Sequence, residues 1–452
     1  MASGRPRRFS RVEKSWILYD WANSSYATII MAAIFPIYFA DIARNAGVSG
    51  DVWWGYATSV ATLTVALLAP VLGAIADFRG MKKKLFSAFL LIGLVFTTTM
   101  ALTDLWQLML VGYVFSYIGF SGSLLFYDSF ITDITTADRM DKISAWGYAM
   151  GYIGGSTIPF ILSIGLILFG EAIGIDGILA VKAACLLCVV WWGVFSIPML
   201  RQVRQVHFVD KPAAALIANS LRNMVRTARD ILADKAIFVF VLAYFFYIDG
   251  VNTVIHMATV YGSTLGLGTT GMILALLVTQ LVAVPFSILF SHLAGRFGSI
   301  RMIRLAIVIY FIICAVGFYM GFSLERVSPS SPLYAAALQR STYLFWAMAV
   351  LVGTCQGGIQ ALSRSFFGKL IPPRRSNEFF GFFDIFGKFA AVMGPALYAL
   401  IANLTGRSSY GILSLMVLFA CGLLTLWFGR RNLALAEAKG AEAARNSRDT
   451  VP

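Results

Sequence analysis

The chain reads Phe379-Phe-Gly-Phe-Phe-Asp-Ile-Phe-Gly-Lys-Phe-Ala-Ala-Val-Met-Gly-Pro395 inside a run of about 25 mostly apolar residues, which is long enough to cross a bilayer as a helix. Asp384 and Lys388 are four positions apart and therefore share one helical face. Each charge near the bilayer centre costs about 2.5–3.5 kcal/mol. The run therefore predicts a membrane helix whose polar side faces protein or a water-filled cavity. The alternative is a structural ion pair that is neutral for stability.

The composition is that of a membrane protein. Of the 452 residues, 59% are hydrophobic and 13% are charged, whereas soluble domains are about half apolar and a quarter charged. We expect no separate soluble catalytic domain, because the segments between apolar runs are short. The five cysteines lie in apolar segments, and we interpret Cys185 and Cys188 as small buried residues rather than a redox pair. The basic N-terminal leader runs into a span that is too long for a signal peptide, so we expect it to stay in the mature chain.

The predicted fold class is an all-α membrane protein with twelve transmembrane helices in two pseudo-symmetric six-helix bundles. Apolar runs predict helices near 16–40, 53–76, 84–103, 106–132, 143–169, 178–199, 236–261, 269–294, 300–322, 341–368, 377–402 and 409–429. We expect an N-terminal bundle (1–199), a basic cytoplasmic linker (200–235), a C-terminal bundle (236–430) and a cytoplasmic tail (431–452).

The basic residues predict the orientation of the chain in the membrane. Thirty of the 36 Lys and Arg residues lie in the N-terminal segment, in every second loop and in the C-terminal tail. The positive-inside rule then places both termini in the cytoplasm. The net charge of +14 is therefore a topology signal, and we expect no nucleic-acid partner.

An internal repeat crosses the long middle loop. At a constant offset of 236 one set of residues aligns with another: Gly122, Ser129, Phe130, Arg139, Gly151 and Pro159 with Gly358, Ser365, Phe366, Arg375, Gly387 and Pro395. At an offset of 218, residues 73–80 align with residues 291–298. Parallel repeats of this kind are typical of major facilitator transporters, which hold substrate between the two halves.

The second loop carries a motif that resembles the cytoplasmic signature of the major facilitator superfamily. It reads Gly73-x-x-x-Asp77-x-Arg79-Gly80, followed by three lysines. An acid here can meet the positive N-terminal end of a neighbouring helix, and the resemblance implies a gate latch. Phe78 and Met81 depart from the signature, which implies a weaker latch. The alternative is an ordinary charged turn.

Polar residues within the predicted membrane helices are candidates for substrate binding or ion coupling. In the N-terminal half they are Asp20, Asn23 and Asp128. In the C-terminal half they are Asp249, Asn252, His256, Gln356, Gln360, Asp384 and Lys388, with Arg364 as a gating candidate. Asp249 and His256 share a helical face and have the composition of a proton relay. Hydrogen-bonded contacts between helices are the alternative for each group.

The acidic and basic residues after the fourth predicted helix lie in a short segment with turn-forming residues. We expect this segment to be a solvated turn, formed by Asp133, Asp138, Arg139, Asp141 and Lys142.

Three blocks of sequence together resemble the vacuolar amino-acid effluxer family, the autophagy-related permeases and their bacterial relatives. The blocks are residues 16–26, 357–372 and 378–388. The resemblance covers nearly the whole chain and implies export of amino acids by alternating access. It favours the bacterial cytoplasmic membrane over a vacuolar membrane.

We therefore expect a secondary transporter, not an enzyme, that exports amino acids or similar zwitterions. Protons carried by Asp249 or Asp384, or sodium ions, would drive it. The alternative is a cation-coupled sugar symporter, since acids on helices 1 and 4 and a lysine on helix 11 also suit that chemistry. We expect a monomer without cofactor or metal, because the three histidines lack metal-ligand spacing and no phosphate-binding Gly-Lys-Ser/Thr motif occurs.

Overall fold

The computed structural model describes residues 8–210, 216–328 and 330–438. Within them twelve helices are long and apolar enough to cross a membrane, which confirms the predicted fold class. They are Arg11–Asn45, Val52–Ala76, Met81–Leu102, Trp106–Ile134, Met140–Ile173, Gly177–Gln202, Lys235–Ala258, Leu274–Phe297, Ser299–Glu325, Tyr334–Leu370, Pro373–Thr405 and Ser408–Phe428. The predicted tail from Lys439 onward and linker residues 211–215 lie outside the described residues.

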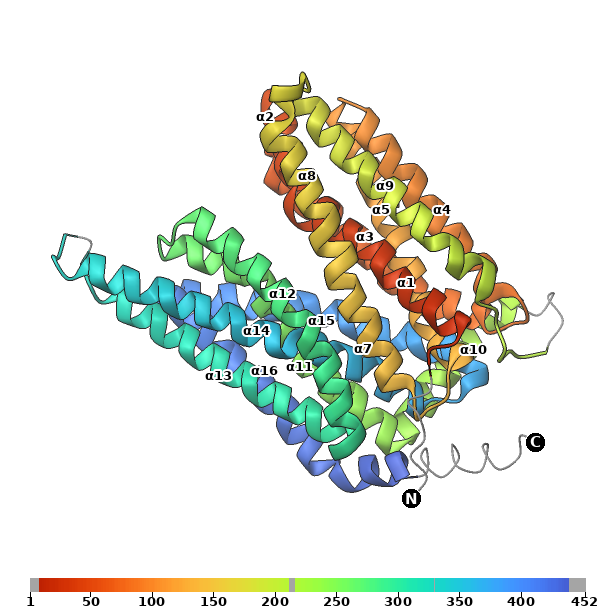
Figure 1. Cartoon of the computed structure of the whole chain (residues 1–452). Helices are drawn as coiled ribbons and strands as arrows, with labels where there is room; N and C mark the ends of the chain where they lie inside the picture. Colours follow the sequence, from red (N-terminus) through yellow and green to blue (C-terminus); the bar gives the residue numbers. More distant parts are fainter. Residues whose placement is uncertain (1–7, 211–215, 329, 439–452) are drawn as a thin grey trace. The chain divides into compact units, whose positions relative to one another are not determined.

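The chain forms two compact units. Unit 1 comprises the residues up to Arg139, Trp146–Ser220 and Pro373–Phe380. Its α-helices of four or more residues are α1 (Arg11–Tyr26), α2 (Phe35–Asn45), α3 (Gly50–Ala76), α4 (Met81–Leu102), α5 (Trp106–Ser129), α6 (Ile131–Ile134), α7 (Met140–Met150), α8 (Ile158–Phe169) and α9 (Gly177–Gln202). Helix α4 lies beside both α5 and α9 (Figure 1).

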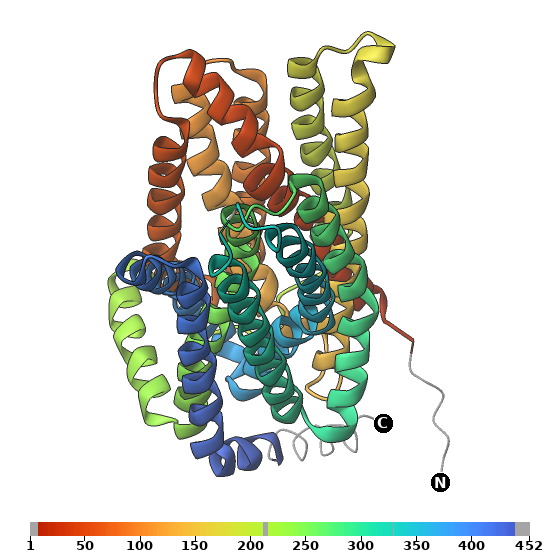
Figure 2. The same cartoon turned by 90° about the vertical axis from the view of Figure 1, so that its left-hand side faces the viewer.

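Unit 2 comprises Met140–Ala145, Leu221–Pro372 and the residues from Gly381 onward. Its helices are α10 (Leu216–Ala233), α11 (Lys235–Thr264), α12 (Thr269–Phe297), α13 (Ser299–Glu325), α14 (Tyr334–Leu370), α15 (Ser376–Thr405) and α16 (Ser408–Phe428). Helix α14 runs beside both α12 and α13 (Figure 1, Figure 2).

Three helices contribute to both units, and one of them is α10, which passes from unit 1 to unit 2 after Ser220. The first turns of α7, up to Ala145, belong to unit 2, although the rest of α7 belongs to unit 1. The first turn of α15, up to Phe380, belongs to unit 1, although the rest of α15 belongs to unit 2. The two shared turns carry the polar clusters described below.

Local sequence explains where the helices begin. Helix α1 starts with a capping box, in which the Glu13 amide donates to Ser10 Oγ (3.1 Å) and the Ser10 amide donates to Glu13 Oε2 (2.8 Å). Asp234 caps α11 by accepting from the amides of Ala236 and Ile237. Such caps satisfy backbone groups that a helix leaves without partners at its start.

Helix α1 continues into a π-helical segment, Ala27–Ala33, and α7 continues into a second one, Gly151–Thr157. The second segment packs closely on α1. A Cβ atom at Gly154 would lie 1.8 Å from the ring of Trp21, and one at Gly155 would lie 2.2 Å from Ser24 Cβ. Only glycine permits this contact. Single-turn π segments are frequent at functional sites, and this one lies against the α1 turn that carries Asp20.

Candidate functional site

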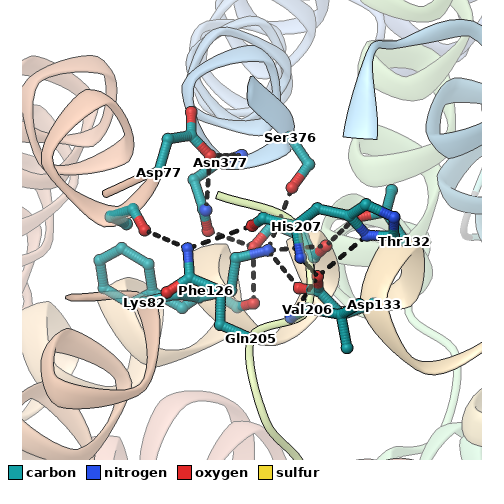
Figure 3. Close-up of polar contacts among 12 residues, drawn as sticks. Asp77, Lys82, Phe126, Thr132, Asp133, Gln205, Val206, His207, Ser376 and Asn377 are labelled. Atoms are coloured by element: carbon teal, nitrogen blue, oxygen red, sulfur yellow. Dashed lines mark hydrogen bonds and ion pairs between the residues drawn. The ribbon is translucent and has the colours of Figure 1, made fainter. Parts of the chain in front are cut away.

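Asp77 holds the first turn of α15 within unit 1 (Figure 3). Its Oδ1 accepts from the Asn377 amide (2.9 Å) and from Asn377 Nδ2 (2.7 Å), and its Oδ2 accepts from the Glu378 amide (3.0 Å). These backbone groups have no partner within their own helix, and the helix dipole favours an anion at this end. The expectation that Asp77 meets a helix N-terminus is confirmed.

The two glycines of the motif have separate structural roles. A Cβ atom at Gly73 would lie 2.4 Å from the carbonyl oxygen of Asn377, so only glycine lets α3 approach α15 this closely. Gly80 has a φ of +73°, a left-handed conformation that favours glycine. Burial raises the pKa of Asp77 to about 7, although the Lys82 charge and the Asn377 and Glu378 donors oppose this rise. The gating role of Gly73, Asp77, Arg79 and Gly80 stays a prediction.

Lys82 forms a second layer behind Asp77. Its ammonium group donates to Asp133 Oδ2 (2.6 Å) and Ser376 Oγ (3.0 Å), and both charged side chains are fully buried. Asp133 Oδ1 also accepts from the backbone amides of Val206 (3.0 Å) and His207 (2.8 Å). Figure 3 shows these groups converging on Asp133. Arg79, by contrast, is exposed and lies over the ring of Phe208.

A corresponding cluster holds the first turn of α7 within unit 2. Asp141 Oδ1 accepts from the Ser365 hydroxyl (2.6 Å), and Oδ2 accepts from the Ser299 hydroxyl (2.8 Å) and Lys369 Nζ (2.6 Å). Arg364 is buried and donates to Ser144 Oγ (2.9 Å) and to the Ser144 carbonyl (3.1 Å). Arg364 therefore fixes the same turn of α7, and its predicted gating role remains open.

The expectation of a solvated turn at 133–142 is wrong for Asp133 and Asp141, and Arg139 is half-buried in an ion pair with Glu13 (2.8 Å). The side chain of Asp133 is fully buried and Asp141 is buried, whereas Asp138 and Lys142 are exposed. The reason is tertiary: residues 206–207 cover Asp133, and Ser299, Ser365 and Lys369 surround Asp141. Those partners lie at least 70 positions away in the sequence, so a local pattern of charges does not reveal them.

Asp20 lies in a buried aromatic cluster of unit 1. Its Oδ2 accepts from the Tyr127 hydroxyl (2.8 Å), and Trp16 stacks on the Tyr127 ring with centroids 4.4 Å apart. The side-chain Nδ2 of Asn23 donates to the Tyr19 carbonyl of its own helix (2.8 Å). Asp128 follows Tyr127 on α5 and is half-buried. Sequence reasoning missed Tyr127, although it stands directly before a predicted site residue.

Asp249 is fully buried in unit 2 and has only one hydrogen-bonded oxygen among the described residues. Oδ1 accepts from the Gly394 amide (2.7 Å), and Oδ2 is buried without a hydrogen-bond partner. A Cβ atom at Gly394 would lie 2.0 Å from Thr253 Oγ1, so the close approach of α15 to Asp249 needs glycine. His256 is exposed and Asn252 is half-buried. No hydrogen bond joins Asp249 to His256 within the part of the chain that the structure describes.

Asp384 and Lys388 form an ion pair along one face of α15, with Lys388 Nζ 2.5 Å from Asp384 Oδ1. The side chains of Asp384 and Lys388 are 26% and 11% exposed. The two side chains therefore share one helical face, as the sequence predicted, and both are partly accessible from outside the protein. Beside the pair, Phe383 stacks on Tyr244 with centroids 3.9 Å apart.

Gln356 lines an apolar cavity of about 90 Å³ between α11, α12, α13, α14 and α16. Gln280 lies in the same lining, and its Oε1 is buried without a hydrogen-bond partner among the described residues. The rest of the lining is almost entirely apolar and contains no charged side chain. Gln360 is half-buried on α14 and does not line this cavity.

Twelve membrane helices in two units, with the signature loop bound at a helix N-terminus, define a transporter of the major facilitator type. The similarity to solved structures agrees. A bacterial homologue of the iron transporter ferroportin in an outward-facing state aligns with a TM-score of 0.65, 12% identity and coverage of 95% of this chain and 98% of that one. The proton:xylose symporter XylE aligns with a TM-score of 0.64, 12% identity and coverage of 92% and 94%.

The family follows from the sequence. This chain belongs to the family described as vacuole effluxer Atg22 like, whose model matches residues 54–439. It is 44% identical over 429 residues to YxiO, an uncharacterized MFS-type transporter of Bacillus subtilis (strain 168), covering 93% of this chain and 95% of that protein. Autophagy-related protein 22 of Cryptococcus neoformans is 25% identical over 323 residues, 68% of this chain and 53% of that protein. The predicted resemblance to the effluxer family is thereby confirmed, and the protein is a multi-pass membrane transporter.

Proposed function

We propose that this protein exports amino acids or similar small zwitterions by alternating access. The observation that carries the proposal is the ion pair of Asp384 and Lys388 on the membrane helix α15. A zwitterion offers one carboxylate and one ammonium group. Its carboxylate can bind Lys388 in place of Asp384, and its ammonium group can bind Asp384 in place of Lys388. Both side chains are partly exposed, which leaves them accessible to such an exchange. Membership of an effluxer family supports the direction of transport.

Asp249 supports proton coupling. It is a buried acid on a membrane helix, and its Oδ2 has no hydrogen-bond partner among the described residues. No salt bridge joins Asp249 to a cation in the described part of the chain. Ionisable residues of this kind inside membrane segments mark proton or ion pathways. We propose that Asp249 takes up and releases the coupling proton.

The turns that begin α7 and α15 support alternating access. In this type of transporter one bundle rocks against the other. Each turn is held by several hydrogen bonds to a buried or nearly buried acid, Asp77 or Asp141. We propose that these bonds form in one access state and break in the other, with Arg364 reinforcing the turn of α7. Termini in the cytoplasm, a bacterial cytoplasmic membrane and a monomeric state complete the proposal.

The cavity beside Gln280 and Gln356 supports a preference for neutral substrates. Its lining is apolar apart from amide and hydroxyl groups, and burying a charged side chain there would be costly. The sugar symporter stays as the alternative, because Asp20, Asp128 and Lys388 also suit that chemistry.

Uptake into vesicles that contain the purified protein tests the proposal. We expect unlabelled neutral amino acids inside the vesicles to drive accumulation of a labelled one, and sugars not to compete. Asp384→Ala and Lys388→Ala should each lower the initial rate at least tenfold. The matched control is Lys182→Ala, because Lys182 of α9 also forms an ion pair, 2.6 Å from Asp104 in the loop between α4 and α5. Full transport by both α15 variants, or competition by sugars alone, would contradict the proposal.

A further inference from the structure

A strongly basic pocket at one end of unit 1 lies beside the signature loop, and the proposed function assigns no role to its lysines or to Arg204. It is an open cavity of about 700 Å³ where α4 begins and α9 has just ended. Four basic side chains line it, and no acidic one does: Arg79, Lys83, Lys84 and Arg204. The pocket is therefore a concentrated positive charge at the end of two membrane helices.

The four basic side chains of the pocket differ in their pairing from the neighbouring Lys82. None of them forms a salt bridge within the described residues, whereas the adjacent Lys82 is paired with Asp133. The first turn of α4 has no acidic residue and no side-chain cap, so its dipole adds further positive potential. Like charges held close together repel each other. An anion in the pocket would relieve that repulsion.

An apolar surface continues from the basic pocket along the membrane. Leu91 and Val95 of α4 are exposed and follow Lys84 at helical spacing, and Val190 and Val194 of α9 are exposed as well. The two helices run in opposite directions, because α4 begins at the pocket and α9 ends near it.

Both apolar stripes lie on the same side of the contact between the helices. A Cβ atom at Gly193 would meet Leu94 at 3.6 Å, which marks the line of contact. About the axis of α4, Leu91 and Val95 lie about 60° and 100° from Leu94 in the same direction of rotation. About the axis of α9, Val190 and Val194 lie at the same two angles from Gly193, again in the same direction. In antiparallel helices these rotations turn toward one common face. That face therefore offers a cationic head site and a continuous apolar track.

We propose that this pocket binds the phosphate-bearing headgroup of an anionic phospholipid, with the acyl chains along Leu91, Val95, Val190 and Val194. A soluble phosphate compound would use the four cations but not the apolar track. A zwitterionic lipid would bring its own ammonium group among the cations. Basic pockets between membrane helices are known to recognise anionic headgroups. The site does not depend on which substrate is transported.

Binding of defined lipids to the detergent-solubilised full chain tests the proposal. Dioleoyl-phosphatidylglycerol, dioleoyl-phosphatidylcholine and glycerol 3-phosphate are each titrated, and bound molecules are counted by native mass spectrometry. We expect phosphatidylglycerol to bind tightest and to raise the midpoint of thermal unfolding, because a ligand stabilises the state it binds. Equal binding of phosphatidylcholine, or equal protection by glycerol 3-phosphate, would overturn the lipid assignment.

A double substitution tests the residues. Lys84→Gln with Arg204→Gln should weaken phosphatidylglycerol binding roughly 20–30-fold, since each basic residue near such a headgroup contributes about fivefold in affinity. The control is Arg296→Gln with Arg301→Gln, two exposed bases of unit 2, which should leave binding unchanged. Equal losses in both double variants would overturn the proposal.

A salt titration of the unmodified protein gives an independent answer. Binding of phosphatidylglycerol should weaken as the salt concentration rises from about 0.05 to 0.5 M, because Arg79, Lys84 and Arg204 are exposed and easily screened. Binding that does not change with salt would overturn the proposal.

Discussion

In unit 1 an acid on the loop, Asp77, holds the first turn of α15, whereas in unit 2 the first turn of α7 supplies the acid itself, Asp141. One contact is the same in both units. The Ser129 hydroxyl bonds to Asn377 Oδ1, and at the repeat offset of 236 the Ser365 hydroxyl bonds to Asp141 Oδ1. The hydrogen-bonding geometry of the repeat is therefore kept at these positions.

The charges are reversed between the two units. The repeat pairs Asp133 with Lys369, and each of them binds a partner of opposite charge, Lys82 or Asp141. The loop acid Asp77 corresponds to Gly295 at the offset of 218. Each cluster contains one acid and one base near the start of a helix. The position that carries the acid Asp133 in unit 1 carries the base Lys369 in unit 2. A difference remains in burial: Lys82 and Asp133 are 0% exposed, whereas the Lys369 side chain is 17% exposed.

The largest effect should come from uncoupling the buried pair of unit 1. Asp133→Asn keeps an acceptor for the amides of Val206 and His207 but removes the direct ion-pair partner of the buried Lys82, which should cost about 3–5 kcal/mol. Asp141→Asn should cost only about 1–2 kcal/mol, because Lys369 reaches solvent. Denaturant unfolding in detergent micelles compares the two variants. Equal losses would break the proposed difference between the clusters.

The next largest effect concerns Asp77 alone. Asp77→Ala leaves the buried amides of Asn377 and Glu378 without an acceptor, at a cost of about 2–3 kcal/mol. Amide hydrogen exchange at the start of α15 should therefore become roughly 30–150-fold faster, and transport should slow with it. Exchange at the start of α7 serves as the internal control and should not change. If α15 exchanges at the rate of the unmodified protein, Asp77 does not hold it.

A third effect, smaller per pH unit than the loss in Asp77→Ala, should appear as a dependence on pH. Burial raises the pKa of Asp77 from 3.8 to about 7, so between about pH 4 and 7 the folded chain keeps a proton that the unfolded chain has lost. The contribution of Asp77 is complete below about pH 4 and is lost as the pH rises through 7, by at most about 1.4 kcal/mol per pH unit. Unfolding measured from pH 5 to 8 should show this slope, and Asp77→Asn should remove it. An unchanged slope in Asp77→Asn would assign the titration to another group.

The smallest effect tests whether the repeated serine contact contributes equally to stability in the two units. Ser129→Ala and Ser365→Ala each remove one hydroxyl that bonds to the first turn of a shared helix. We expect each to lower the free energy of unfolding by about 1 kcal/mol, and the two losses to agree within about 0.5 kcal/mol. Unequal losses would mean that the repeated contact carries different weight in the two units.

Local patterns in the sequence were sufficient for much of the candidate site. The spacing of Asp384 and Lys388 predicted one helical face, and the two side chains bond along it. The spacing of Gly73, Asp77 and Gly80 predicted an acid at a helix end, and Asp77 bonds to the start of α15. The first prediction depends on neighbours within one helix, whose geometry is nearly invariant. The second depended on the resemblance of the loop to a family signature, because Asp77 and Asn377 are 300 positions apart.

The sequence by itself determined the twelve helices, because the apolar length needed to cross a bilayer is a local property of the chain. Only the tertiary structure decided which acids are buried and what they bind. Asp133 is covered by residues 206–207, and Asp249 meets the Gly394 amide from a helix more than a hundred positions away. Burial and hydrogen bonding depend on the packing of distant segments, and neither hydrophobic periodicity nor charge spacing encodes which segments meet.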